Sequence, residues 1–357
     1  MKTGNRGMMG KRIFILLLCG LFLFTAGGCQ KKDADTKLVL TTGFKKNEIF
    51  RIETVSCTLP EIMVYLTNTQ DQYESVYGKE IWKTDLNGVT LEENVKETVL
   101  AQLAQIKTMN LLAQQHGVAL SDAELKTVKT AAAAYYNSLN QAERECMNVT
   151  EDIIENLYAE FALANKVYEY IIKDINPEIS DDEARTITVE HILIVTYALD
   201  GTGKKIEYTQ NAREEARQQA EDILKLAREE DSDFEELVLQ YSEGDKGTFS
   251  FGKGETDPAF EEAAFNLGTG EISDIVETEY GYHIIKCIST FNREETDANK
   301  VKIVEKRREE VFGQEYDAFV TSLTRTLNEE LWENVTFIEN DEVTTRDFFD
   351  IYNQYFG

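Results

Sequence analysis

The sequence predicts an α+β protein, in which a small and mostly antiparallel sheet with surrounding helices is inserted into a mainly α-helical lobe. Residues 48–178 and 297–330 carry apolar side chains at helical spacing. Residues 189–290 instead open and close with short β-branched segments bounded by Gly and polar turns. A helix near the C-terminus needs an apolar surface to pack against. We therefore expect the lobe to be built from the N- and C-terminal segments.

The N-terminus is typical of a secretory signal. Basic residues without any acid precede an apolar run over residues 13–24, which is too short for a comfortable membrane span. Small residues then lead to Cys29, a pattern that resembles a bacterial lipobox, with Ala26 where Leu is usual. The resemblance implies that Cys29 is diacylated and becomes the new N-terminus when residues 1–28 are removed. Two acyl chains would anchor the chain durably, whereas one would be marginal. Ordinary cleavage near Gly27 is the alternative.

The expected mature chain is strongly acidic. Removing the four basic residues of the signal leaves 33 of the 37 Lys and Arg against 65 Asp and Glu, a formal charge of −32. This charge excludes nucleic acid and an anionic membrane surface as electrostatic partners. Residues 29–47 are polar and are expected to form a lipid-anchored tether.

The remaining cysteines do not suggest a disulfide framework. Besides Cys29 they are Cys57, Cys146 and Cys287, and a bridge between Cys57 and Cys146 is left open by the sequence. No CxxC motif and no cluster of Cys and His occurs. We therefore expect no metal and no cofactor.

The N-terminal segment 48–178 contains several helix start and stop signals. Thr90-x-x-Glu93 and Ser121-x-x-Glu124 are capping boxes that each precede an apolar stripe, and Thr150 starts a further helix. Gly117 suits the left-handed stop of the first of these helices. Such stripes are usually core, and we interpret them in this way.

A hinge over residues 174–186 leads into a separate domain, residues 185–292. Its first strand begins at Val189, a helix is predicted over 212–228, and its last strand ends near Lys286. The chain has three histidines. Two of them, His191 and His283, occupy matched places in these strands, so a strand pair would bring them side by side.

The motifs between these strands follow in a fixed order. They are His191-Ile-Leu193, Asp233-Phe-x-x-Leu237, Tyr241-Ser242, Phe251-Gly-Lys-Gly254, Pro258-x-Phe-Glu-x-Ala-Ala-Phe265, Gly270-Glu-Ile-Ser273 and Thr278-x-Tyr-Gly-Tyr-His283. The block resembles a parvulin-type peptidyl-prolyl isomerase domain over about a hundred residues. The resemblance implies the parvulin fold and catalysis of cis/trans isomerisation at Xaa-Pro bonds.

The resemblance also implies the site residues. The implied catalytic residues are His191, His283, Asp245 and Thr278, and the implied proline cup is Phe251, Thr256, Phe260 and Thr248. Three departures from the family pattern concern the cup and one loop. Thr256 stands where Met is usual and Thr248 where Leu is usual. The loop after Ser242 is shorter, so that strict spacing puts Gly244 at the family's Cys or Asp position, with Asp245 one residue late.

The chemistry requires no nucleophile. Rotation about an Xaa-Pro bond has a barrier of about 18–20 kcal/mol, which a site lowers when it binds the twisted amide better than either planar isomer. An apolar cup holds the proline ring, and removal of water from the carbonyl assists. Neutral imidazoles can fix each other's tautomer.

The alternative is that the two histidines only join central strands. Cys287 is expected in the core, and Lys204-Lys205 as solvated charge.

The C-terminal segment 293–357 is expected to pack on the N-terminal lobe. It contains a long helix over 297–330, a short strand over 335–338 and an aromatic end. The layout resembles PrsA-type extracellular foldases and, more loosely, SurA-type chaperones. This resemblance implies a foldase anchored to the outer face of a bacterial cell membrane, whose partners are unfolded secreted proteins with Xaa-Pro bonds. The alternative is a non-catalytic holdase. Whether two copies form a homodimer is left open.

Overall fold

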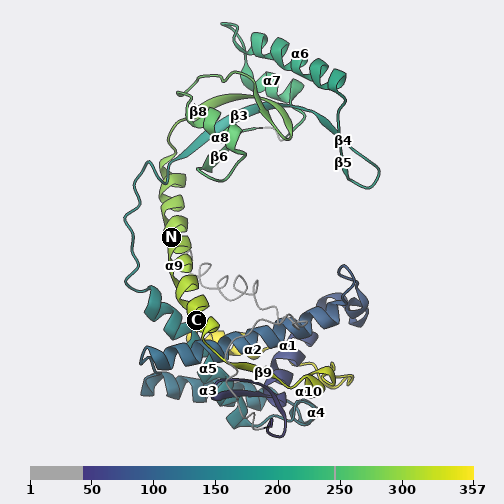
Figure 1. Ribbon diagram of the computed structural model, residues 1–357, viewed down its shortest axis with the longest axis vertical. Helices are drawn as coiled ribbons and strands as arrows, with labels where there is room; N and C mark the ends of the chain where they lie inside the picture. The colour runs from purple at the N-terminus through teal and green to yellow at the C-terminus, as the bar shows by residue number, and fades with distance from the viewer. Residues whose placement is uncertain (1–42, 245–246) are drawn as a thin grey trace, which may run out of the picture. The chain divides into compact units, whose positions relative to one another are not determined.

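The computed structural model describes residues 43–244 and 247–357. The predicted signal, Cys29 and residues 30–42 of the tether lie outside them, as does Asp245. The described chain divides into two compact units, shown in Figure 1. The first contains the described residues up to Asp174 together with Phe312–Gly357, and the second is Ile175–Val311. Both units combine helices with small antiparallel sheets, which confirms the predicted α+β class.

Five α-helices form the N-terminal part of the first unit. They are α1 (Leu59–Tyr77), α2 (Leu91–Gln115), α3 (Asp122–Ser138), α4 (Gln141–Cys146) and α5 (Glu151–Ile172), with a 3₁₀ turn, η1 (Lys79–Lys83), after α1. The predicted capping boxes are confirmed, since Thr90 and Ser121 each accept a hydrogen bond from the backbone N–H three residues on. No helix in the described ranges is long and apolar enough to cross a bilayer.

A three-stranded antiparallel sheet joins the two ends of this unit. Its order is β2 (Val55–Thr58), β1 (Glu48–Ile52) and β9 (Arg325–Leu327), with Phe50 opposite Leu327. The predicted strand over 335–338 is wrong. The backbone of Ile338 instead bonds on both sides to the Gln70 side-chain amide, at 3.0 Å each. The predicted helix 297–330 ends early, because α9 (Arg293–Thr321) gives way to β9 and then α10 (Glu329–Glu333).

The aromatic end of the chain is helical and lies in the core of the first unit. Helix α11 (Phe348–Phe356) buries Phe348 completely. The Phe348 ring centroid lies 4.6 Å from that of Tyr158 and 5.2 Å from that of Tyr135. The Tyr158 hydroxyl also donates to the Phe348 carbonyl at 2.6 Å. This helix therefore completes a core whose other side comes from α3 and α5.

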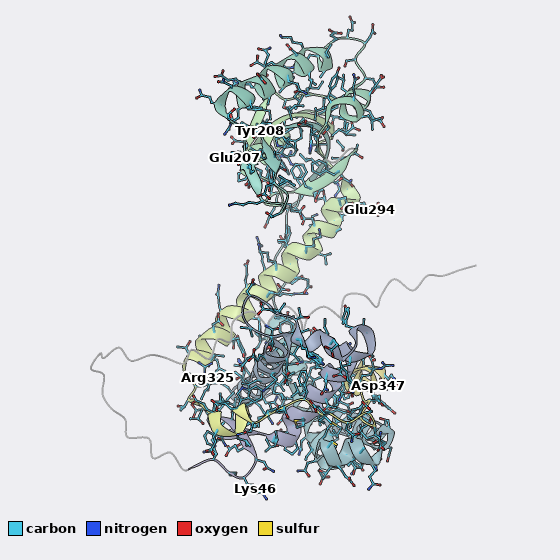
Figure 2. All side chains as sticks on the ribbon, turned by 90° about the vertical axis from the view of Figure 1, so that its right-hand side faces the viewer. Lys46, Glu207, Tyr208, Glu294, Arg325 and Asp347 are labelled. Carbon is cyan, nitrogen blue, oxygen red and sulfur yellow. The ribbon has the colours of Figure 1, made fainter. Side chains whose placement is uncertain are left out.

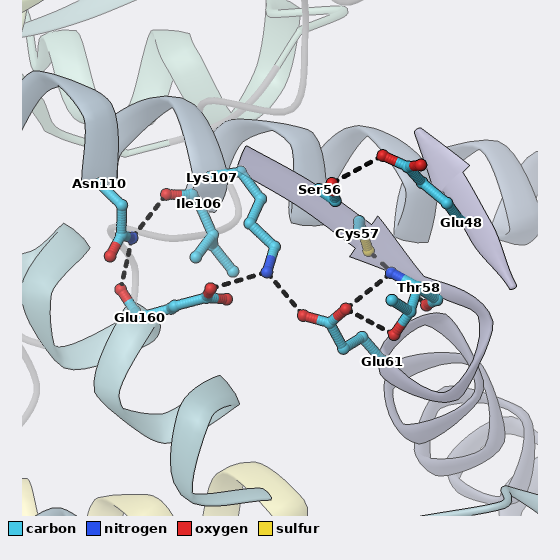
Figure 3. Close-up of polar contacts among 9 residues, drawn as sticks. All are labelled: Glu48, Ser56, Cys57, Thr58, Glu61, Ile106, Lys107, Asn110 and Glu160. Carbon is cyan, nitrogen blue, oxygen red and sulfur yellow. Dashed lines mark hydrogen bonds and ion pairs between the residues drawn. The ribbon is translucent and has the colours of Figure 1, made fainter. Parts of the chain in front are cut away.

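A buried ionic cluster ties α1, α2 and α5 together (Figure 3). The Lys107 Nζ, in a side chain only 4% exposed, contacts Glu61 Oε1 at 2.6 Å and Glu160 Oε1 at 2.7 Å. Cys57 lies beside this cluster as a buried free thiol, whereas Cys146 is free and exposed. The bridge that the sequence left open between these two cysteines is therefore not formed.

The second unit is built on a four-stranded antiparallel sheet. Its order is β6 (Phe249–Gly252), β3 (Thr186–Val195), β8 (Gly281–Ser289) and β7 (Val276–Thr278). Successive side chains along each strand point to opposite faces of the sheet, so the unit has one core on each face. Ile192, Ile194 and Ile284 pack with α6 (Gln210–Ala227) and α7 (Phe234–Tyr241), and the opposite face packs with α8 (Pro258–Phe265). Cys287 is fully buried, as expected.

A two-stranded hairpin extends from β3. It consists of β4 (Tyr197–Leu199) and β5 (Lys205–Glu207). Figure 2 labels Glu207 and Tyr208 at the end of this hairpin and Glu294 in the first turn of α9. The hairpin is anchored by a hydrogen bond from the Tyr208 N–H to the Thr196 carbonyl, at 2.9 Å.

Candidate active site

Two neighbouring strands bring the paired histidines together. In the register of β3 and β8, Leu193 lies opposite His283 and His191 opposite Ile285. The histidines are therefore diagonal neighbours on one face, the distance at which large side chains still touch. Their ring centroids are 5.3 Å apart with the planes at 85°. The sequence prediction that a strand pair joins them is confirmed.

Thr278 lies next to this pair at the turn between β7 and β8. Its Oγ1 is 2.8 Å from His283 Nε2 and accepts a hydrogen bond from the Tyr280 N–H at 3.1 Å. The turn depends on Gly281, which has φ +144. A Cβ at this position would lie 2.1 Å from the Ile194 carbonyl oxygen. Only glycine therefore allows the turn to approach β3 so closely.

The His283 imidazole is held neutral. Its exposed fraction is 5%. Burial, with a smaller contribution from the nearby His191, lowers the pKa of His283 from 6.5 to about 4. Desolvation disfavours the charged form of a base, which is the direction seen here. A neutral ring at Thr278 can donate or accept, so the hydroxyl and the ring fix each other's orientation.

Phenylalanine rings enclose the histidine pair. The Phe260 centroid lies 5.3 Å from that of His191 and 5.2 Å from that of His283. Phe251 lies 5.8 Å from Phe260, and both rings are buried. The structure adds Phe249, whose ring lies edge-on to His191 at 5.4 Å. Strand alternation could have revealed Phe249, because it stands two residues before Phe251 on β6.

The other predicted cup residues are placed differently. Thr248 is exposed. Thr256 is half-buried, and its Oγ1 is buried without a hydrogen-bond partner in the described part of the chain. A hydroxyl here replaces the usual thioether, so this position offers a polar atom where the family pattern has an apolar one.

The loop after α7 brings Gly244 against Leu193 and His191. The Leu193 N–H donates to Ser242 Oγ at 3.2 Å, and the Glu243 N–H to the Leu193 carbonyl at 2.9 Å. A Cβ on Gly244 would lie 3.6 Å from His191 Nε2. The position next to the imidazole that strict spacing assigns to Cys or Asp therefore holds no side chain in this protein. Asp245 lies outside the described residues.

The arrangement can bind an apolar ring and desolvate an amide. It offers aromatic walls, two imidazoles and the hydroxyls of Thr278 and Thr256. Among the described residues, no group of three or more His, Cys, Asp and Glu side chains is placed to hold a metal ion.

Comparison with known proteins identifies this block. A family model described as PPIC-type PPIASE domain matches residues 191–289. Foldase protein PrsA of Clostridium acetobutylicum is 26% identical over 318 residues, which cover 82% of this chain and 88% of the relative. Foldase protein PrsA of Caldanaerobacter subterraneus is 29% identical over 64% of this chain and 69% of the relative. A crystal structure of the peptidylprolyl isomerase PrsA from Bacillus cereus is 20% identical over 73% of this chain and 91% of that one, with a TM-score of 0.35.

The predicted isomerase domain is thereby confirmed. Residues 191–289 form a PPIC-type, or parvulin-type, peptidyl-prolyl cis–trans isomerase domain. The domain match begins at His191, within β3, and includes all of β8 with His283 and the helix that carries Phe260. The chain is a peptidyl-prolyl isomerase that is similar to the PrsA foldases.

Proposed function

We propose that the chain is a lipid-anchored foldase that isomerises Xaa-Pro bonds of secreted proteins on the outer face of a bacterial cell membrane. The observation that carries the proposal is the packing of Phe249 and Phe260 against the paired histidines, with Phe251 beside both rings. The proline ring packs among these rings, where the carbonyl before it loses water. A desolvated amide resists twisting less, because water stabilises the charge-separated planar form more than the twisted form, and removing water takes that stabilisation away.

The polar groups act on the orientation of the twisted amide. Neutral His283, fixed by Thr278, holds the adjoining His191 ring, and His191 faces the position of Gly244. Thr256 contributes its unpaired hydroxyl to the bound peptide. The helical unit holds unfolded substrate. Cys29 carries the anchor. The relatives named Foldase protein PrsA support the foldase role.

The direct test is prolyl cis/trans exchange, measured by NMR on unphosphorylated Xaa-Pro peptides with the full chain. Phe260→Ala should reduce the catalysed exchange rate by at least about tenfold, because it removes a wall of the cup. Phe260→Leu keeps more apolar volume in the cup, so it should retain a larger share of the parent's catalysed exchange rate than Phe260→Ala does. Amide spectra of both variants check that the domain remains folded.

A folded parent chain without any acceleration would contradict the enzymatic role. Suppression of aggregation by that same chain would then favour the holdase, for which the missing side chain at Gly244 is the supporting observation.

The anchor has its own test. Cys29→Ser should move the chain from the membrane fraction to the soluble fraction of cells, because lipidation requires the thiol. Retention in the membrane fraction of a variant that has lost residues 1–28 would contradict the lipid anchor.

A further inference from the structure

The hairpin β4–β5 is fastened to the active-site turn by one lysine. The Lys205 Nζ donates to the Glu279 carbonyl at 2.6 Å. It also lies 4.8 Å from the ring centroid of Tyr197 and 5.8 Å from that of Tyr280. The Lys205 side chain is 32% exposed and pairs with Glu207 at 3.1 Å. The prediction that Lys205 is a solvated charge is therefore wrong, because the folded hairpin places it against the turn.

The bonded carbonyl belongs to the peptide group that holds Thr278. The C=O of Glu279 and the N–H of Tyr280 lie in one plane and point in opposite directions. Lys205 binds the oxygen, and the N–H donates to Thr278 Oγ1 at 3.1 Å. Thr278 Oγ1 in turn lies 2.8 Å from His283 Nε2. An unbroken series of contacts thus runs from the lysine to the imidazole.

We propose that Lys205 is a positioning residue for the isomerase: it fixes the Glu279–Tyr280 peptide plane and thereby holds Thr278 against His283. The inference rests on the proposed roles of Thr278 and His283. Hydrogen bonds from charged donors are the stronger ones, so this contact holds the plane more firmly than a neutral bond would. The Thr196 N–H, which donates to the Tyr280 carbonyl at 3.2 Å, secures the other side of the turn.

A competing role for Lys205 is to bind an acidic residue of the substrate. The structure favours the internal role, because the ammonium already faces a carbonyl, a carboxylate and two aromatic rings. The two roles differ in what they do to neutral peptides. A positioning residue affects every Xaa-Pro peptide equally, whereas an anion-binding residue affects only acidic ones.

The test is Lys205→Met in the full chain, with exchange measured on Ala-Pro and Glu-Pro peptides. The catalysed rate at saturating peptide should fall about tenfold on both, with little change in KM. The side-chain ¹⁵N shifts of His283 should move, because its contact with Thr278 loosens. Lys205→Arg should restore most of the rate. Lys204→Met makes the same charge change at an exposed neighbour and should leave rate and shifts unchanged.

The outcomes separate this inference from the proposed function. An unchanged rate in Lys205→Met, together with a loss in Thr278→Val, overturns the positioning role alone. A rise in KM confined to Glu-Pro peptides also overturns it, in favour of substrate binding. If neither Thr278→Val nor Phe260→Ala lowers the rate of a folded chain, the proposed site itself is wrong.

Discussion

At the scale of single residues, the neutral His283 predicts how stability depends on pH. Its pKa is about 4 in the folded chain and about 6.5 when unfolded, so the unfolded state binds more protons between these values. The contribution of the neutral His283 to the free energy of unfolding is fully present above pH 6.5. This contribution is lost as the pH falls from 6.5 toward 4. The expected loss is about 3 kcal/mol, at 1.36 kcal/mol per pKa unit. Urea unfolding of the parent and of His283→Gln, across this range, measures it.

The difference between the two chains isolates this histidine from the carboxylates that also titrate in acid. Catalysed exchange should be nearly constant from pH 6 to 8, because the ring stays neutral there. Parallel pH dependence of stability in the parent and in His283→Gln would contradict the prediction.

Lys107 is the second residue with a sharp prediction. Lys107→Met should destabilise the first unit by about 3–5 kcal/mol, because it leaves the Glu61 and Glu160 carboxylates buried without their cation. Adding Glu160→Gln should recover part of the loss. Lys129→Met removes a charge from the exposed face of α3 and should change stability by less than about 0.5 kcal/mol. Chemical unfolding followed by tryptophan fluorescence reports all three, and equal losses for Lys107 and Lys129 would refute the account.

At the scale of elements, Gly281 controls the pairing of β8 with β3. Gly281→Ala should destabilise the isomerase domain by more than about 2 kcal/mol, since its Cβ would meet the Ile194 carbonyl at 2.1 Å and φ +144 is strained for alanine. Gly313→Ala, which lies in the first unit, is a control that should leave the isomerase domain unchanged and slightly stabilise its own unit. It lies in α9, where a Cβ has open space, and alanine favours a helix by about 1 kcal/mol. Domain unfolding monitored by amide exchange distinguishes them, and a tolerated Gly281→Ala would contradict the proposed close approach.

The elements differ in how far the sequence predicts them. Capped amphipathic helices such as α2 and α3 are predictable, because cap and stripe are local. Helix α1 is harder, since residues 60–68 are buried in succession and show no stripe, although the Thr58–Glu61 capping box marks its start. Strand β9 cannot be predicted from local sequence signals, because it pairs with β1, in which Phe50 lies opposite Leu327 although the two residues are far apart in the sequence.

The same distinction holds for the site. His191, His283, Phe251 and Phe260 belong to motifs with fixed spacing, and the structure brings them together. Lys205 gives no such signal, because its contacts exist only after the hairpin meets the turn after β7.

At the scale of the whole molecule, the two units have separate cores and should respond separately to mutation. Phe348 is fully buried against Tyr65, Tyr135 and Tyr158 of the first unit. Phe348→Ala should therefore cost this unit about 3–5 kcal/mol. Both tryptophans of the chain, Trp82 and Trp332, lie in the same unit, so their fluorescence follows its unfolding alone.

The isomerase unit, Ile175–Val311, contains every described site residue and none of the Phe348 contacts. In Phe348→Ala, the urea concentration at the midpoint of unfolding, followed by tryptophan fluorescence, should be lower than in the parent. The rate of prolyl exchange measured without urea should equal that of the parent. Tyr355→Ala, on the same helix but 42% exposed, should change the free energy of unfolding of this unit by less than about 0.5 kcal/mol. Loss of exchange in Phe348→Ala would show that the isomerase domain depends on the helical unit, because no contact within its own core has changed.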